Sequence, residues 1–127
     1  MGRGRVLVIG MNPSSYVGPS RRSLALSRLN EWMDYVGVRY FSFVNAVPTP
    51  GVARIRDVQW DVLRECVEFG YDSVIALGKL ASLATRRVGG ECFELPHPSG
   101  LNRKLNDAAY VERVLTECRR YVMDRSA

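Results

Sequence analysis

A short apolar run, RVLVIG at residues 5–10, leads directly into MNPSS at residues 11–15. An uninterrupted apolar run of this length predicts a strand that is buried on both faces, as in a parallel sheet. The glycine and the Asn-Pro pair that follow predict a tight loop at the end of the strand. Further short strands of this kind are predicted at 40–44, 73–77 and 92–95.

Between the strands, apolar residues recur every three or four positions, which is the spacing of helices with one buried face. The second of these helices is expected to start with Asp57 as its N-cap and to bury Val58, Val62, Cys66 and Phe69. The expected helices span 25–36, 57–69, 79–88 and a last segment that starts at Asn106 or Asp107.

Strand and helix therefore alternate along the whole chain. This alternation predicts an α/β protein with a four-stranded, mainly parallel sheet between two layers of helices. The chain has 127 residues, of which 46% are hydrophobic, and both values fit one packed domain. We therefore expect a single three-layer α/β/α domain over residues 1–127.

Several classes of protein are disfavoured by composition. Cys66, Cys92 and Cys118 are scattered and form no C-x-x-C pair, so neither a disulfide framework nor a zinc or iron–sulfur site is expected. No apolar run is long enough to cross a bilayer, and the N-terminus lacks the apolar core of a signal peptide. We expect a cytoplasmic monomer without a metal, a cofactor or a membrane partner.

The positive charge is concentrated in one half of the chain. The formal net charge is +5, with +6 in residues 1–56 and −1 in residues 57–127. Sixteen of the eighteen basic residues are arginine, which binds phosphate through two parallel hydrogen bonds. Nucleic acid is therefore an expected partner, although a solvated surface or a codon bias toward arginine would give the same composition.

The loops after the strands carry more polar groups than turns require. In a parallel sheet these loops meet at the carboxyl ends of the strands, where ligands bind. Turn formation explains each loop singly, since Asn, Pro, Ser and Gly are common turn residues. Together they would bring Asn12, Asn45 and His97, the only histidine of the chain, to one rim.

The same loops resemble the motifs of the uracil-DNA glycosylase superfamily, in the same order along the chain. Residues 10–13 (GMNP) resemble the first motif, in the asparagine form of the mismatch-specific and single-strand-selective branches. Residues 43–47 (FVNAV) resemble the strand end that carries the base-reading asparagine, and 74–78 (VIALG) the strand before the last motif. Residues 97–101 (HPSGL) resemble the second motif, and Asn102-Arg103 follow as in the mismatch-specific branch.

The resemblance implies hydrolysis of the N-glycosidic bond of a pyrimidine in DNA. His97 would donate a hydrogen bond to the departing base, and Asn12 would hold the attacking water. Asn45 would read the O4 and N3–H edge of uracil, while Gly10 and Met11 of the first motif would line the base pocket. The family also stacks the base on an aromatic residue, and Tyr16 is nearest to the expected position, because Phe41 and Phe43 are predicted as strand residues.

DNA would be held next to the pocket. Leu101 would fill the gap that the flipped base leaves in the duplex. Ser14 stands where other branches carry glycine or a bulky tyrosine that screens out thymine, which would admit a 5-substituted pyrimidine. The residues expected to contact DNA are Ser14, Ser99, Gly100, Leu101, Arg103 and Lys104.

Two other functions stay open on the sequence alone. One is a non-catalytic DNA-binding module of the same fold, whose basic half grips phosphates. The other is a glycosidase that acts on a nucleotide or on a hypermodified base. Ordinary glycoside hydrolysis is disfavoured because the loops lack the required pair of carboxylates, and a serine hydrolase because no G-x-S-x-G motif exists.

Overall fold

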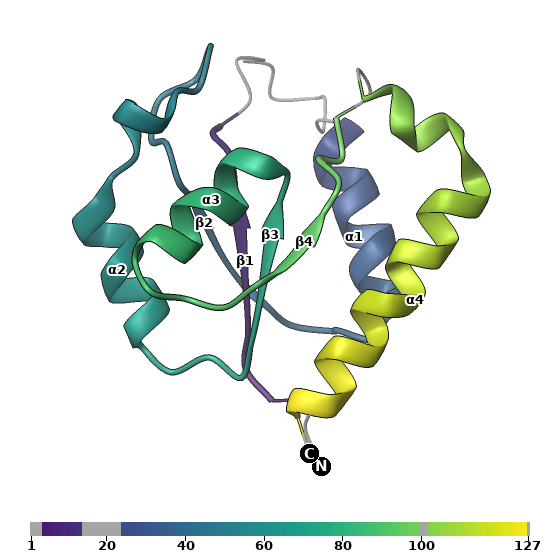
Figure 1. Ribbon diagram of the computed structural model, residues 1–127. Coiled ribbons are helices and arrows are strands. Elements are labelled where there is room, and N and C mark those ends of the chain that lie inside the picture. The colour runs from purple at the N-terminus through teal and green to yellow at the C-terminus, as the bar shows by residue number, and fades with distance from the viewer. Residues whose placement is uncertain (1–3, 14–23, 100–101, 127) are drawn as a thin grey trace.

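A four-stranded parallel sheet organises the chain (Figure 1). The computed structural model describes residues 4–13, 24–99 and 102–126 of the 127. The sheet order is β2-β1-β3-β4, and all three neighbouring pairs are parallel. The α/β class and the four-stranded sheet predicted from the sequence are therefore confirmed. The strands are β1 (Val6–Gly10), β2 (Ser42–Asn45), β3 (Ser73–Leu77) and β4 (Phe93–Leu95).

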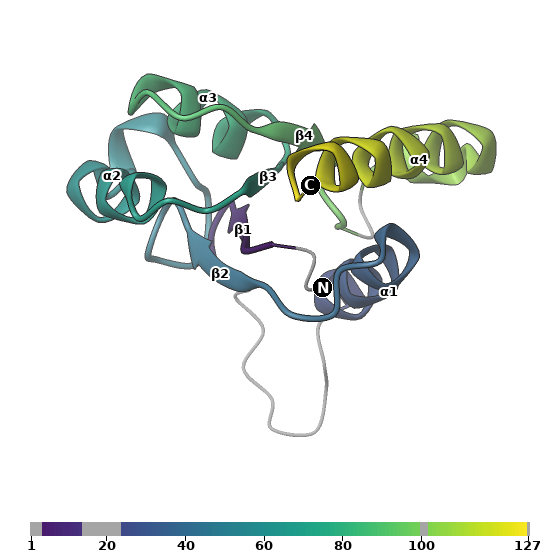
Figure 2. The same cartoon turned by 90° about the horizontal axis from the view of Figure 1, so that it is seen from below.

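Helices cover both faces of the sheet, so the architecture has three layers. Seen from below, α2 and α3 lie on one side and α1 and α4 on the other (Figure 2). Two short 3-10 turns, η1 (Ile55–Asp57) and η2 (Arg103–Asn106), precede α2 and α4. The helices are α1 (Leu24–Val36), α2 (Trp60–Glu68), α3 (Lys79–Arg87) and α4 (Ala108–Arg125).

Burial on both faces of the sheet explains the continuous apolar sequence of the central strand β1. Val6 and Val8 face the core shared with α1 and α4, whereas Leu7 and Ile9 face the core shared with α2 and α3. Each of these side chains is at most 2% exposed. A strand buried on both sides must be apolar at every position, which is why the run 5–10 shows no alternation.

The start of the second helix is predicted wrongly. Asp57 is not an N-cap: it ends η1, the next residue Val58 is extended, and α2 begins at Trp60. The expected buried face is right at two of its four positions, since Val58 is 6% exposed and Cys66 packs against the same core cluster. Leu63 is 1% exposed, whereas Val62 and Phe69, which were expected inside, are 43% and 64% exposed. A periodic pattern does not reveal the interruption of the backbone at Val58.

Smaller corrections concern the ends of other elements. β2 runs from Ser42 to Asn45 rather than over 40–44, so Asn45 lies in the strand, and Tyr40 is 82% exposed. Of the two expected caps of the last helix, Asp107 is used, because its Oδ1 accepts a hydrogen bond from the Tyr110 N–H at 3.1 Å. Among the described residues, no helix has the length and apolar character needed to cross a membrane.

The Tyr121 hydroxyl forms hydrogen bonds with the backbone of β3 at Val74, just before the first residue of β3 that pairs with β4. β4 pairs with β3 only from Ile75 onward. One residue earlier, the Val74 N–H donates to Tyr121 Oη at 3.3 Å, and this hydroxyl donates to the Val74 carbonyl oxygen at 3.3 Å. The phenol therefore replaces the missing partner strand for one residue.

Tyr121→Phe is expected to lower the free energy of unfolding by about 1–2 kcal/mol, because it leaves two backbone groups without a partner. Urea denaturation measures this value. The control is Tyr35→Phe, which removes an exposed hydroxyl contact to Thr116 at 3.4 Å and should change stability little. Equal effects of the two substitutions would contradict the role given to Tyr121.

Candidate functional site

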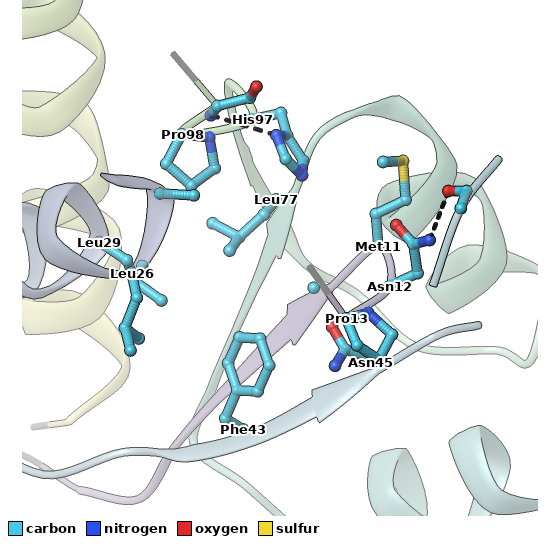
Figure 3. Close-up of a pocket in the computed structure, with 14 residues that line it drawn as sticks. Met11, Asn12, Pro13, Leu26, Leu29, Phe43, Asn45, Leu77, His97 and Pro98 are labelled. Carbon is cyan, nitrogen blue, oxygen red and sulfur yellow. Dashed lines mark hydrogen bonds between the residues drawn. The ribbon is translucent and has the colours of Figure 1, made fainter. Parts of the chain in front are cut away.

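A pocket of about 540 Å³ lies at the carboxyl ends of the strands (Figure 3). Its lining includes Asn12 after β1, Asn45 at the end of β2 and His97 after β4. These three side chains come from distant parts of the sequence and face one cavity. Leu26 and Leu29 of α1 and Leu77 of β3 form an apolar wall on the other side.

His97 lies on the loop that follows β4, directly above Gly78. A side chain at position 78 is disfavoured by the backbone, since φ is +90° there, and its Cβ would lie 3.4 Å from the His97 Cβ. The Gly78 N–H donates to the Leu95 carbonyl at 2.7 Å, which fixes the ends of β3 and β4 against each other. His97 therefore lies against the hydrogen-bonded ends of β3 and β4.

The environment of His97 selects one state of its ring. The Ser99 N–H donates to Nδ1 at 3.2 Å, so a neutral ring carries its proton on Nε2 (Figure 3). Burial lowers the pKa of His97 from its ordinary value of 6.5, because the charged form loses solvation. Burial therefore favours the neutral ring, in which one N–H is available as a donor to a ligand.

Asn12 is fixed by its amide nitrogen. Nδ2 donates to the Gly51 carbonyl at 2.8 Å and to the Thr49 carbonyl at 3.1 Å. Because both neighbours are acceptors, the orientation of the amide is determined, and Oδ1 is left to accept a hydrogen bond. An aspartate here would set its carboxylate against two carbonyl oxygens, so this loop favours the amide.

Asn45 lies beside Gly10 in the register of β1 and β2. A Cβ on Gly10 would be 2.7 Å from Asn45 Oδ1 and 2.6 Å from Phe43 Cζ. Glycine is thus required so that these two side chains can lie across the end of β1. The Asn45 amide forms no hydrogen bond within the part of the chain that the structure describes, and it can therefore bind a ligand.

Phe43 is a site residue that the sequence analysis missed. It lines the pocket, is 47% exposed, and lies on the same face of β2 as Asn45, two residues away. The alternation of a strand was the signal that could have identified it, because residues i and i+2 share a face. Placing the end of the strand at residue 44 concealed this relation.

The remaining predicted site residues are distributed unevenly. Met11 and Ser99 line the pocket, whereas Arg103 and Lys104 are exposed on η2 and do not line it. The loop is held by Asn102, whose Nδ2 donates to the His97 carbonyl at 3.0 Å. The positions that lie outside the described residues are Ser14, Tyr16, Gly100 and Leu101.

The pocket combines a mainly apolar lining with a few polar side chains, and it is not acidic. None of its described lining residues is an aspartate or a glutamate. Within the described ranges there is also no group of three histidine, cysteine or acidic side chains that could hold a metal ion. The polar side chains of this lining are the carboxamides of Asn12 and Asn45, the imidazole of His97 and the hydroxyl of Ser99, and their chemistry is hydrogen bonding.

The sequence matches no model of a known protein family and no curated protein. The likeness to the uracil-DNA glycosylase superfamily thus depends on the four short motifs described above.

Proposed function

We propose that this protein is a DNA glycosylase that hydrolyses the N-glycosidic bond of uracil or a related modified pyrimidine. The base would be flipped out of DNA into the pocket at the carboxyl ends of the strands. One observation carries the proposal: Asn12, Asn45 and His97 line the same pocket, each with a hydrogen-bonding group available to a ligand. No metal or organic cofactor is needed for this reaction.

The His97 Nε2–H would stabilise the leaving group. When the glycosidic bond breaks, the departing base gains negative charge, and the sugar becomes similar to an oxocarbenium ion. A fixed donor to the base carbonyl O2 binds this anion more strongly than the neutral base, so it lowers the barrier. The hydrogen bond to Nδ1 supports this role because it places the proton on Nε2.

Asn12 would hold the attacking water. Its Oδ1 can accept one hydrogen bond from the water, while the two bonds of Nδ2 prevent rotation of the amide. An amide cannot take the proton of the water, so Asn12 positions the nucleophile and does not deprotonate it. The leaving base is a stable anion, which is why a positioned water suffices.

Asn45 would determine the base. A carboxamide offers one donor and one acceptor, which match O4 and N3–H of uracil. Cytosine presents the opposite pattern and would leave the amide unpaired, at a cost of about 1–3 kcal/mol. A Cβ at position 10 would lie 2.7 Å from Asn45 Oδ1, so the glycine leaves room for this amide at the pocket.

DNA would be bound around the mouth of the pocket. Arg103 and Lys104 follow the His97 loop directly and are exposed, so they can reach phosphates. The expected wedge Leu101 and the expected contacts of Ser14 and Gly100 remain predictions from the sequence.

The test is incubation with single-stranded and duplex oligonucleotides that carry one uracil, followed by hot alkali, which cleaves at abasic sites. We expect cleavage at the uracil position and none in the matched thymine oligonucleotide. Binding that weakens steeply with salt, without any base release, would favour the non-catalytic module instead. Base release from nucleotides but not from oligonucleotides would favour a glycosidase that acts on a nucleotide.

Phe43→Leu is expected to raise KM for the uracil oligonucleotide about tenfold, because stacking of a base on an aromatic ring contributes about 1–3 kcal/mol. Phe43→Trp should keep KM within a few-fold. The matched control is Tyr40→Leu, which removes an exposed aromatic ring from the segment before β2, outside the pocket. If both leucine variants behave alike, Phe43 does not contact the base.

A further inference from the structure

Arg28 connects helix α1 to the loop that carries His97. Its half-buried guanidinium donates through Nη1 to the carbonyl oxygens of Pro98 and Ser99, each at 3.3 Å. The residues that it joins are 70 and 71 positions apart in the sequence. Neither the periodicity of α1 nor the motif around His97 indicates this contact.

The peptide group between Pro98 and Ser99 forms a hydrogen bond at each end, one with Arg28 and one with His97. The Pro98 carbonyl and the Ser99 N–H belong to the same planar unit, which is trans and therefore points them in opposite directions. The carbonyl end accepts from Arg28, and the N–H end donates to His97 Nδ1 at 3.2 Å. Arg28 and the imidazole are thus joined through a single rigid peptide.

We propose that Arg28 is a positioning residue that fixes the tautomer of His97 through the Pro98–Ser99 peptide. The catalytic consequence depends on the proposed function, whereas the effect on the tautomer does not. A cation on the carbonyl oxygen polarises the peptide and strengthens donation by its N–H. It also prevents the peptide from turning its carbonyl toward Nδ1, which would place the proton on the wrong nitrogen for donation into the pocket.

The burial of His97 agrees with this role. Desolvation lowers the pKa of His97 and so favours the neutral ring. Burial does not choose between the two neutral tautomers. That choice depends on the partner of Nδ1, and Arg28 holds the peptide that supplies this partner.

The experiment uses the fact that His97 is the only histidine in the chain. Nitrogen-15 NMR of the labelled imidazole at pH 8 reports the ratio of the two neutral tautomers without further assignment. We expect the Nε2–H form in the wild type and a rise of roughly tenfold in the ratio of Nδ1–H to Nε2–H in Arg28→Met. The control is Arg39→Met, which removes an exposed arginine beyond the end of α1 and should leave the ratio unchanged.

Kinetics give a second readout. For uracil release we expect kcat to fall about tenfold in Arg28→Met with KM within about twofold, because the orientation of the donor matters most in the transition state. Arg28→Gln serves if the methionine variant does not fold, since a neutral and shorter donor should shift the tautomer ratio in the same direction.

An unchanged tautomer ratio in a folded Arg28 variant would overturn the proposal, as would an Nδ1–H ring in the wild type. If the protein releases no base at all, the proposed function fails, but the tautomer measurement still decides the role of Arg28. If base release occurs and the ratio does not move, only the inference about Arg28 fails.

Discussion

His97→Ala is expected to lower kcat for uracil release about 10²–10³-fold, the loss that follows removal of one fixed donor to a developing anion. The interaction is stronger in the transition state than in the ground state, so kcat and kcat/KM should fall by similar factors. Single-turnover base release, with the protein in excess over a uracil oligonucleotide, measures the chemical step directly.

The decrease in kcat must be distinguished from the effect of a loss of folded structure. His97 packs above Gly78, so thermal unfolding of His97→Ala should be measured beside that of the wild type. Glu117→Gln, an exposed substitution on α4, provides a control with full activity. If folded His97→Ala releases uracil at a rate within twofold of the wild type, His97 does not stabilise the leaving base.

Asn12→Ala is expected to lower kcat about 10²-fold, because the attacking water loses the acceptor that positions it. The substitution also removes the two hydrogen bonds that Nδ2 donates to Thr49 and Gly51. We therefore also expect a decrease of about 1 kcal/mol in the free energy of unfolding. Rate and stability should be measured on the same preparation.

Gly51→Ala distinguishes these two effects. Gly51 has a φ of +100°, so alanine strains the loop, while the Asn12 amide is left in place and the new Cβ meets no other atom within 4 Å. If loosening of this loop caused the loss of activity, Gly51→Ala would be as slow as Asn12→Ala. We expect it to be substantially faster.

The positions of β1 and β3 could be predicted because a strand buried on both faces is apolar at nearly every residue. β1 and β3 are buried at all five positions, and both were identified as uninterrupted apolar runs. The meeting of Asn12, Asn45 and His97 followed from the rule that loops at the carboxyl ends of parallel strands are neighbours. Fold class and the location of the pocket therefore depend on local pattern and topology.

The finer features of the site depend on contacts between distant residues. The Asn12 amide is oriented by carbonyl groups 37 and 39 residues away, and Arg28 reaches a loop 70 residues away. Backbone acceptors carry no sequence signature, because every residue has a carbonyl group. The start of α2 was misplaced for a related reason: the break at Val58 is a matter of backbone angles, and the apolar pattern continues through it.

The most direct test is the amount of free uracil that the wild-type protein releases from a uracil-containing oligonucleotide in a single turnover, quantified by mass spectrometry. We predict that the wild type releases one mole of free uracil for each mole of abasic sites formed. The double variant Asn12→Ala/His97→Ala should release none above background. A folded wild-type protein that binds the oligonucleotide yet liberates no more uracil than this double variant would contradict the assignment of the pocket as a base-excision site.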